Sequence, residues 1–244
     1  MLPFFRKIRW LLAADNQFFK YSRYAIGEIV LVVIGILIAL QINNWNEDRK
    51  SMQIEYITLS ELKKNIKANI HNMDSTEANI VQRLASIDAI LTAFENDEAF
   101  SDSLSNHFAW AMIYDRMPIN TGAYESFKES GTQVVKDDEL RFMITNYFDY
   151  HIGVLNDFLA EVRDDFYSYM LGYLRENFKT YIGVDRIAIP KDFEDLSQNE
   201  TFILSLGIFY DVQRDALRGT RQARKRSVEL LEKIDLRLNE LNKN

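Results

Sequence analysis

The sequence predicts an all-α protein: a single N-terminal transmembrane helix that continues into an antiparallel helical bundle. Only 3 prolines and 9 glycines occur in 244 residues, so few positions interrupt a helix. Apolar residues recur at helical spacing along most of the chain, and no segment shows the apolar–polar alternation of a half-buried strand. A long apolar segment near the N-terminus adds the transmembrane helix to this prediction.

The apolar segment has the length of a membrane span. Residues 29–40 carry no polar side chain, and the flanking Tyr24 and Trp45 extend the segment to 22 residues. At ~1.5 Å per residue this helix is about 32 Å long, close to a hydrocarbon core of roughly 30 Å. The sequence after residue 40 lacks the small residues of a cleavage site, so we expect a permanent signal anchor, and neither a cleaved signal nor a buried core helix.

The charges on either side of this segment predict its orientation. Residues 1–45 hold five basic and two acidic residues, although the whole chain has a net charge of −7. By the positive-inside rule we expect a cytoplasmic N-terminus and a main domain in the bacterial periplasm, anchored in the inner membrane. The chain then divides into a cytoplasmic basic-aromatic interfacial segment (1–23), a transmembrane helix (24–45) and a periplasmic helical domain (46–244).

Glu28 is an acidic residue in the first turns of the apolar segment. Its carboxylate could simply reach the interface, or pair with Arg23 or Lys20. Alternatively, Glu28, Gly35 and Ala39 share one helical face, where small residues would let another helix approach closely. Because intramembrane carboxylates usually face protein or water, this face is our candidate for helix packing, either in self-association or with a membrane-protein partner.

Helical spacing of apolar residues continues past the membrane segment to about residue 73, which predicts one continuous rod. Further helices are expected over residues 74–95, 101–115, 122–130, 137–178 and 197–241. The last of these carries an apolar seam of 3–4 spacing at Leu231, Ile234, Leu238 and Leu241. This seam favours antiparallel packing of the last helix against the first rod.

Capping patterns predict where three of these helices begin. Asp74 with Glu77, and Ser197 with Glu200, have the spacing of a capping box. Asp137 is an expected N-cap of the long pattern that follows it.

Glycines predict the interruptions of the helices. Gly131 is expected to end the helix before it as residue C′. Bends are expected at Gly153 or Gly172, and a break near Gly207. Residues 179–197 form the longest segment without helical spacing and are expected to be irregular.

No recognisable catalytic or metal-binding motif occurs in the sequence. The absence of cysteine excludes disulfides, thiolate metal sites and a cysteine nucleophile. His71, His107 and His151 lack a ligand partner at helical i+4 spacing, and phosphate-binding or nucleophile-elbow glycine patterns are absent. We therefore expect no cofactor and no metal, and the acidic main domain argues against a nucleic-acid partner.

Two groups of residues are candidates for an interaction surface. The first is aromatic and does not fall on one helical stripe, so some members should be exposed, although core packing explains most of them: Tyr147, Tyr150, Phe166, Tyr167, Tyr169 and Tyr173. The second is basic, and it could be either a solvated face paired with acidic neighbours or a contact for lipid headgroups or an acidic partner: Arg218, Arg221, Arg224 and Lys225.

The segment GEIVLVVIGILIALQINNWNE at residues 27–47 resembles the opening of a large family of uncharacterised, membrane-anchored proteins from Bacteroidota, classed as a domain of unknown function. A second, looser likeness is AYESFKESG at residues 123–131, followed by the acidic start at Asp137 and then Leu140-Arg141. The resemblance implies a bacterial inner-membrane location and a helical body. It implies no activity.

These patterns favour a non-enzymatic scaffold or interaction module of the cell envelope, whose partners are the lipid bilayer and either a second copy or another membrane protein. The alternative is a periplasmic ligand-sensing bundle that signals through a partner, because an inner segment of about 23 residues could not signal alone. An enzyme with an unrecognised site is the third hypothesis.

Overall fold

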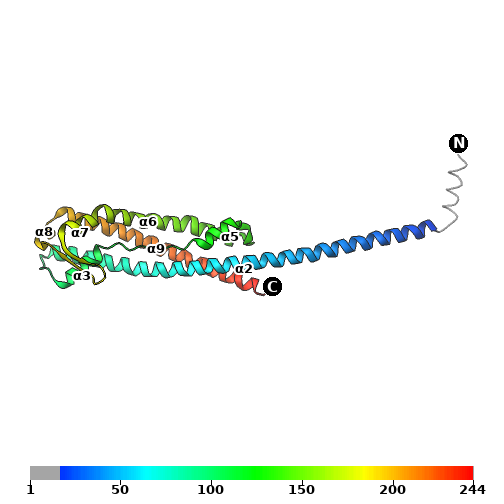
Figure 1. The fold of residues 1–244 in the computed structure, drawn as a ribbon, viewed down its shortest axis with the longest axis horizontal. Coiled ribbons are helices and arrows are strands. Elements are labelled where there is room, and N and C mark those ends of the chain that lie inside the picture. Colours follow the sequence, from blue (N-terminus) through cyan, green and yellow to red (C-terminus); the bar gives the residue numbers. More distant parts are fainter. Residues whose placement is uncertain (1–16, 244) are drawn as a thin grey trace, which may run out of the picture. The chain divides into compact units, whose positions relative to one another are not determined.

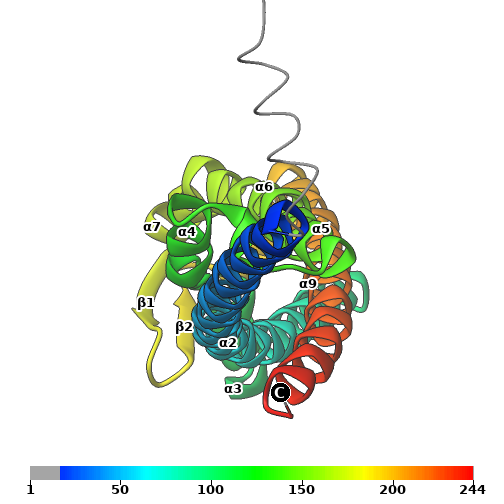
Figure 2. The ribbon, with the colours of Figure 1, turned by 90° about the vertical axis from the view of Figure 1, so that its right-hand side faces the viewer.

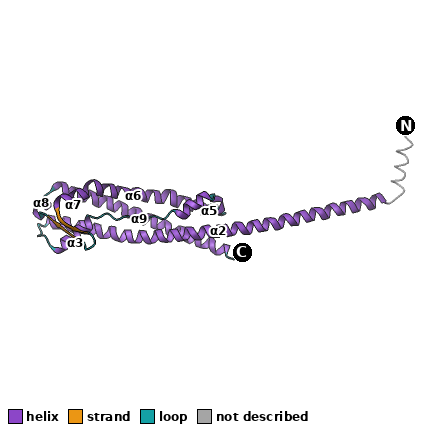
Figure 3. Ribbon diagram, viewed as in Figure 1, coloured by secondary structure: helices purple, strands orange, loops and turns teal. Residues whose placement is uncertain are grey.

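The computed structural model describes residues 17–243, and the chain divides into two compact units, Met1–Ile54 and Glu55–Asn244, which we describe separately. The described residues are helical apart from loops and one short hairpin, which confirms the all-α prediction (Figures 1 and 3). Helix α2 (Gln17–Glu95) belongs to both units. The first sixteen residues of the expected interfacial segment lie outside the described residues.

The first unit carries the apolar part of α2. Every side chain from residue 25 to residue 50 is exposed, and Leu31 is 74% exposed. In the described part of the chain, α2 is the one helix long and apolar enough to cross a membrane. Its most apolar 18-residue window has a mean hydropathy of 2.6, and none of that window is buried.

The second unit is built on three long helical stretches that run side by side: the later part of α2, α6 (Ile152–Asp165) and α9 (Glu200–Leu241) (Figures 1 and 2). The shorter elements are α3 (Asp102–Ala111), α4 (Gly122–Glu129), η1 (Thr132–Val134), α5 (Asp138–Asn146), η2 (Tyr147–His151), η3 (Phe166–Met170), α7 (Leu171–Asn177), β1 (Phe178–Ile182), β2 (Ile187–Pro190) and α8 (Phe193–Ser197).

Side-chain pairs fix the direction of α9 against α2. Glu55 pairs with Arg237, Asp74 with Arg224 and Arg83 with Gln213, so residue numbers fall along α9 as they rise along α2. The two helices are therefore antiparallel, as the apolar seam of α9 predicted.

The core of the second unit consists of two hydrophobic clusters. One gathers at the α3, α7 and α8 end and includes Ile87, Phe108, Phe178 and Phe202. The other gathers at the α4 and α5 end and includes Leu59, Leu62, Tyr147 and Ile234. Both contain residues from α2 and α9, so these two helices run the length of the core.

Helix α2 passes through Asp74 without a break, so the predicted capping box and second helix are wrong. The side chains of Asp74 and Glu77 do not cap a helix end; they form ion pairs with Arg224 and Arg221 of α9. Arginines distant in the sequence therefore bind the two carboxylates that the local pattern assigned to a helix cap.

Two other predicted helix boundaries are confirmed. The Asp137 carboxylate accepts a hydrogen bond from the Leu140 N–H, 2.9 Å away, and so caps α5. Gly131 follows α4 with φ of +84°, a conformation that favours glycine and ends the helix.

Two predictions about α9 are wrong. Its N-cap is Asn199, whose side-chain oxygen accepts from the Phe202 N–H at 3.0 Å, whereas the Ser197 hydroxyl donates to the Glu194 carbonyl. The helix also continues through Gly207 without a break. A single glycine costs a helix only about 1 kcal/mol, which packing along α9 offsets.

The long pattern after Asp137 contains two π-helical segments, η2 and η3. Each ends two residues before a glycine at which we expected a bend, Gly153 and Gly172. A π-helical turn holds an extra residue, so it shifts the side chains that follow around the helix axis.

We expected residues 179–197 to be irregular, and this prediction is wrong. The segment contains an antiparallel hairpin and α8. Ile182 pairs with Ile187 across the turn, and the register shifts between Phe178 and Thr180. The register shift interrupts the alternation of burial in β1, and β2 has no polar side chain, so neither strand shows a period of two in the sequence. Within the turn, Arg186 has a positive φ of 53°.

Gly219 allows α9 to approach α6 closely. A Cβ atom at this position would lie 2.5 Å from Cδ2 of Phe158, whereas a Cβ at Gly207 would meet nothing within 4 Å. We expect Gly219→Ala to lower the free energy of unfolding by about 1–3 kcal/mol through overpacking. The matched variant Gly207→Ala should raise it by up to about 1 kcal/mol. Urea unfolding followed by circular dichroism measures both, and equal stability of the two variants would contradict close packing at Gly219.

Candidate functional site

The predicted packing face of the apolar segment lies on α2. Glu28, Gly35 and Ala39 are all exposed, and a Cβ added to Gly35 would meet nothing within 4 Å. Helical geometry places the three on one side of α2. Among the described residues, nothing from the chain itself covers this face.

The aromatic group divides between core and surface. Tyr147 and Phe166 are buried, and Tyr173 is half-buried with its ring 5.1 Å from that of Phe202. The Ser227 hydroxyl donates to the Tyr147 hydroxyl at 2.8 Å, and burial raises the pKa of this tyrosine. These three rings pack the bundle together.

The exposed members are Tyr150, Tyr167 and Tyr169, at 59%, 52% and 59%. Tyr150 lies in η2 and the other two in η3, which at ~1.5 Å per residue puts them about 25 Å apart along the helical stretch. Tyr167 and Tyr169 are therefore neighbours along η3, although residues two apart on a helix point to different sides, and Tyr150 lies apart from both.

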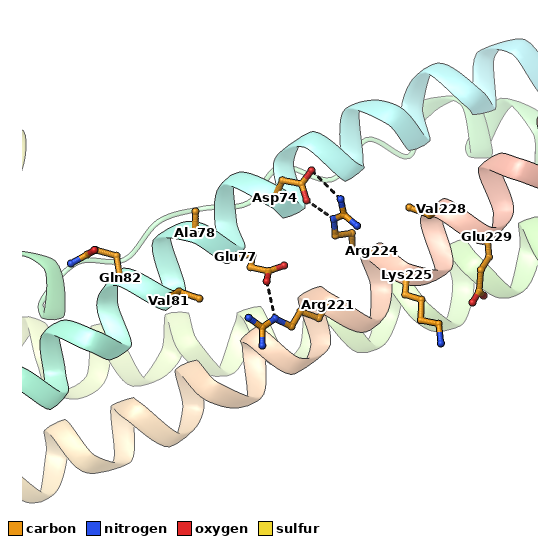
Figure 4. A pocket seen from close by; sticks show the side chains of 10 residues that line it. All are labelled: Asp74, Glu77, Ala78, Val81, Gln82, Arg221, Arg224, Lys225, Val228 and Glu229. Atoms are coloured by element: carbon orange, nitrogen blue, oxygen red, sulfur yellow. Dashed lines mark hydrogen bonds and ion pairs between the residues drawn. The ribbon is translucent and has the colours of Figure 1, made fainter.

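Three of the four residues of the basic group, all except Arg218, line a surface groove between α2 and α9, of about 980 Å³ (Figure 4). Ala78, Val81 and Val228 supply its apolar lining, and Arg221, Arg224 and Lys225 lie along its α9 side. The groove is a feature of tertiary structure, because its two walls come from segments about 150 residues apart in sequence.

Most of the basic side chains are paired. The Arg221 Nε lies 2.8 Å from Glu77 Oε1, and Arg224 binds both carboxylate oxygens of Asp74. The hydrogen bond to Asp74 raises the pKa of Arg224.

Arg218 pairs with Asp215 within α9, at 3.3 Å, whereas Lys225 forms no ion pair within the described residues. Exposed pairs of this kind each contribute only about 0–1 kcal/mol. The pairs of Arg221 and Arg224 join α9 to α2. Together with the pair of Arg218, they leave little unpaired positive charge for an external partner.

Besides Ser86, three polar residues on the buried face of α2 were not identified from the sequence as site residues: Glu55, Asn69 and Arg83, at 0%, 0% and 2% exposure. Each is fourteen residues, or two heptads, from the next. They share one face of α2 with buried apolar residues such as Leu59 and Leu62. A polar residue at such a position indicates a buried polar pair, although the sequence alone does not identify the residue that it pairs with.

Glu55 forms a two-pronged ion pair with Arg237 of α9. Arg237 Nε and Nη2 lie 2.9 and 3.0 Å from the two carboxylate oxygens, and the Lys136 N–H donates to Glu55 Oε1 at 3.2 Å. The hydrogen bond to Glu55 raises the pKa of Arg237. This clamp joins α2, α9 and the segment before α5 at one end of the bundle.

Asn69 holds the segment that returns from α3 to α4 along the bundle. Its side-chain amide donates to the Asn120 carbonyl at 3.0 Å and accepts from the Asn120 N–H at 2.7 Å. One turn further, the Asn72 amide donates to the Pro118 carbonyl at 2.8 Å. The side chains thus replace the backbone partners that a strand or helix would give this segment.

A family model described as a family of unknown function, DUF6090, matches residues 28–166, more than half of the chain. No curated protein and no solved structure matches the chain. The matched region begins at Glu28 and contains the apolar segment of α2, together with Glu55, Asn69 and Arg83.

The clamp predicts a large stability effect at Glu55. We expect Glu55→Ala to lower the free energy of unfolding by about 3 kcal/mol, because it leaves a partly buried Arg237 without its main partner. The control is Glu47→Ala, which removes an exposed ion pair with Lys50 and should change stability by less than about 0.5 kcal/mol. Urea unfolding of both variants measures the difference, and similar values would show that the clamp does not stabilise the bundle.

Proposed function

We propose that the chain, which belongs to the DUF6090 family of unknown function, is a single-pass scaffold or interaction module of the bacterial cell envelope. The observation that carries this proposal is the apolar segment of α2, which is exposed on all sides and continues into the helical domain without a break. Its partners would be the lipid bilayer and either a second copy of the chain or another membrane protein.

The exposure of this segment supports a lipid environment. A helix that is apolar around its whole circumference is normally covered by protein or by lipid. Ile29, Leu31 and Leu37 are 63%, 74% and 58% exposed, so none of the described part of the chain covers them. Contact with water over such a length would be strongly unfavourable, whereas hydrocarbon tails would solvate it.

The charge distribution supports the orientation. Basic residues precede the segment, so the N-terminus would face the cytoplasm and the acidic helical domain the periplasm, from an anchor in the inner membrane. A domain held in this way is within reach of proteins of the same membrane and of the periplasm.

The second unit has features of a binding module. In the groove, the ion pairs of Arg221 and Arg224 with acidic residues of α2 hold the two helices together, so this surface is formed before any partner binds. Tyr167 and Tyr169 expose their rings on η3, and exposed aromatic side chains are common in protein contact surfaces. A partner would therefore bind a preformed helical surface.

Membrane anchoring and orientation can be tested together. We expect the full chain to remain with membranes during alkaline carbonate extraction, because hydrocarbon solvates the apolar segment. A periplasm-dependent reporter fused after Asn244 should be active, and the same reporter fused after Arg23 should be inactive. Release by carbonate, or activity of a cytoplasm-dependent reporter after Asn244, would overturn the proposal.

Self-association through Glu28, Gly35 and Ala39 makes a separate prediction. Gly35→Leu should reduce the size of the complex extracted in mild detergent, because the added side chain would block close helix approach. A lone protomer can accommodate it, since a Cβ at Gly35 meets nothing within 4 Å. Leu37→Ala, on the opposite side of the helix, is the control and should leave the size unchanged. Light scattering after size exclusion measures both, and an unchanged size for Gly35→Leu would exclude this face.

A further inference from the structure

A buried polar cluster lies where α2, α9 and the segment after α3 meet, and none of its residues lines the groove. At its centre is Arg83 of α2, which is 2% exposed. Its Nη1 donates to Gln213 Oε1 and its Nη2 donates to Asp115 Oδ2, each at 2.9 Å. Gln213 is fully buried, whereas the Asp115 side chain is 32% exposed and opens one side of the cluster to solvent.

Several buried donors of this region lack an acceptor. Arg83 Nε, Gln213 Nε2 and Arg186 Nη1 are buried and have no hydrogen-bond partner among the described residues. Because the Gln213 carbonyl oxygen already accepts from Arg83, the unpaired Nε2 of the same amide lies beside the guanidinium. Buried donors normally have an acceptor, so three unpaired donors indicate that an acceptor is needed here.

The other two polar residues of the α2 row provide an internal comparison. The Glu55 carboxylate and the Asn69 amide have partners for every polar atom in the chain itself. Arg83 has the same burial and the same place in the row, and it retains an unpaired Nε. Unpaired polar atoms are thus not a general property of this seam.

The cluster also carries excess positive charge. Burial lowers the pKa of Arg83, the nearby positive charge of Arg186 lowers it further, and the carboxylate of Asp115 opposes both effects. The buried guanidinium of Arg83 therefore has a second positive charge nearby, and the one carboxylate that binds it is partly exposed. A second negative charge would compensate the two guanidinium groups.

Arg186 has an uncommon backbone conformation, and contacts with Trp110 and Asn106 hold it in place. Its φ of 53° is rare for a residue other than glycine, and its guanidinium carbon lies 3.7 Å from the centre of the Trp110 ring. The Asn106 side chain donates to the Arg186 carbonyl at 3.4 Å. Strained residues of this kind often mark binding sites.

We propose that Arg83, Arg186 and Gln213 form a binding site for a small oxyanion. Oxygen acceptors on one anion would satisfy the unpaired N–H groups, and its charge would neutralise the excess of the two guanidinium groups. A water molecule would supply an acceptor without the charge. The site is independent of membrane anchoring, so it stands or falls separately from the proposed scaffold function.

The test is thermal unfolding of the full chain in detergent, with sodium phosphate or sodium acetate compared with sodium chloride at equal pH and ionic strength. We expect the midpoint temperature to rise with phosphate concentration along a saturable curve, since a ligand that binds the folded state stabilises it. Acetate distinguishes a carboxylate from a tetrahedral anion as the preferred oxyanion, and a saturable rise with either supports the site.

Arg186→Gln is the decisive variant, because Arg83→Met removes a core residue and could prevent folding. Arg186→Gln should abolish the saturable rise, whereas Arg218→Gln, which removes an exposed arginine of α9, should retain it. The proposal is overturned if the wild-type midpoint is the same in phosphate, acetate and chloride. It is also overturned if Arg186→Gln retains the full rise, or if Arg218→Gln loses it equally.

Discussion

The continuity of α2 is the constraint on which the rest of the structure depends. A helix satisfies its backbone hydrogen bonds internally, so one helix can cross from lipid to a protein core when only its side chains change. Its apolar segment is exposed on every side, and from Glu55 onwards its buried residues follow a 3–4 spacing.

The polar row of α2 sets how the other segments lie against it. Glu55 is paired with Arg237 at one end, Asn69 holds the returning segment at Asn120, and Arg83 meets Gln213 further along. Apolar contacts alone would tolerate a shift of one helical turn, whereas such a shift would leave a buried charge or amide without its partner. An oxyanion at Arg83 would supply the ligand that the ligand-sensing alternative requires.

Local patterns predicted what local interactions decide. The Asp137 cap and the Gly131 stop depend on residues within one turn, and both are present. The Asp74 capping box failed because Arg224, 150 residues away, binds its carboxylate. The sequence offered candidate surfaces by residue type alone, whereas the groove and the buried partners depend on pairings across the fold, such as Glu55 with Arg237, that one sequence does not reveal.

The surroundings of α2 can be measured residue by residue, because the chain has no cysteine and single cysteines can be introduced for spin labelling. In liposomes, labels at residues 29–40 should all be accessible to oxygen and protected from a water-soluble relaxation agent. Labels from residue 55 onwards should alternate between buried and accessible with helical period. Access of the water-soluble agent throughout residues 29–40 would contradict a lipid-solvated helix.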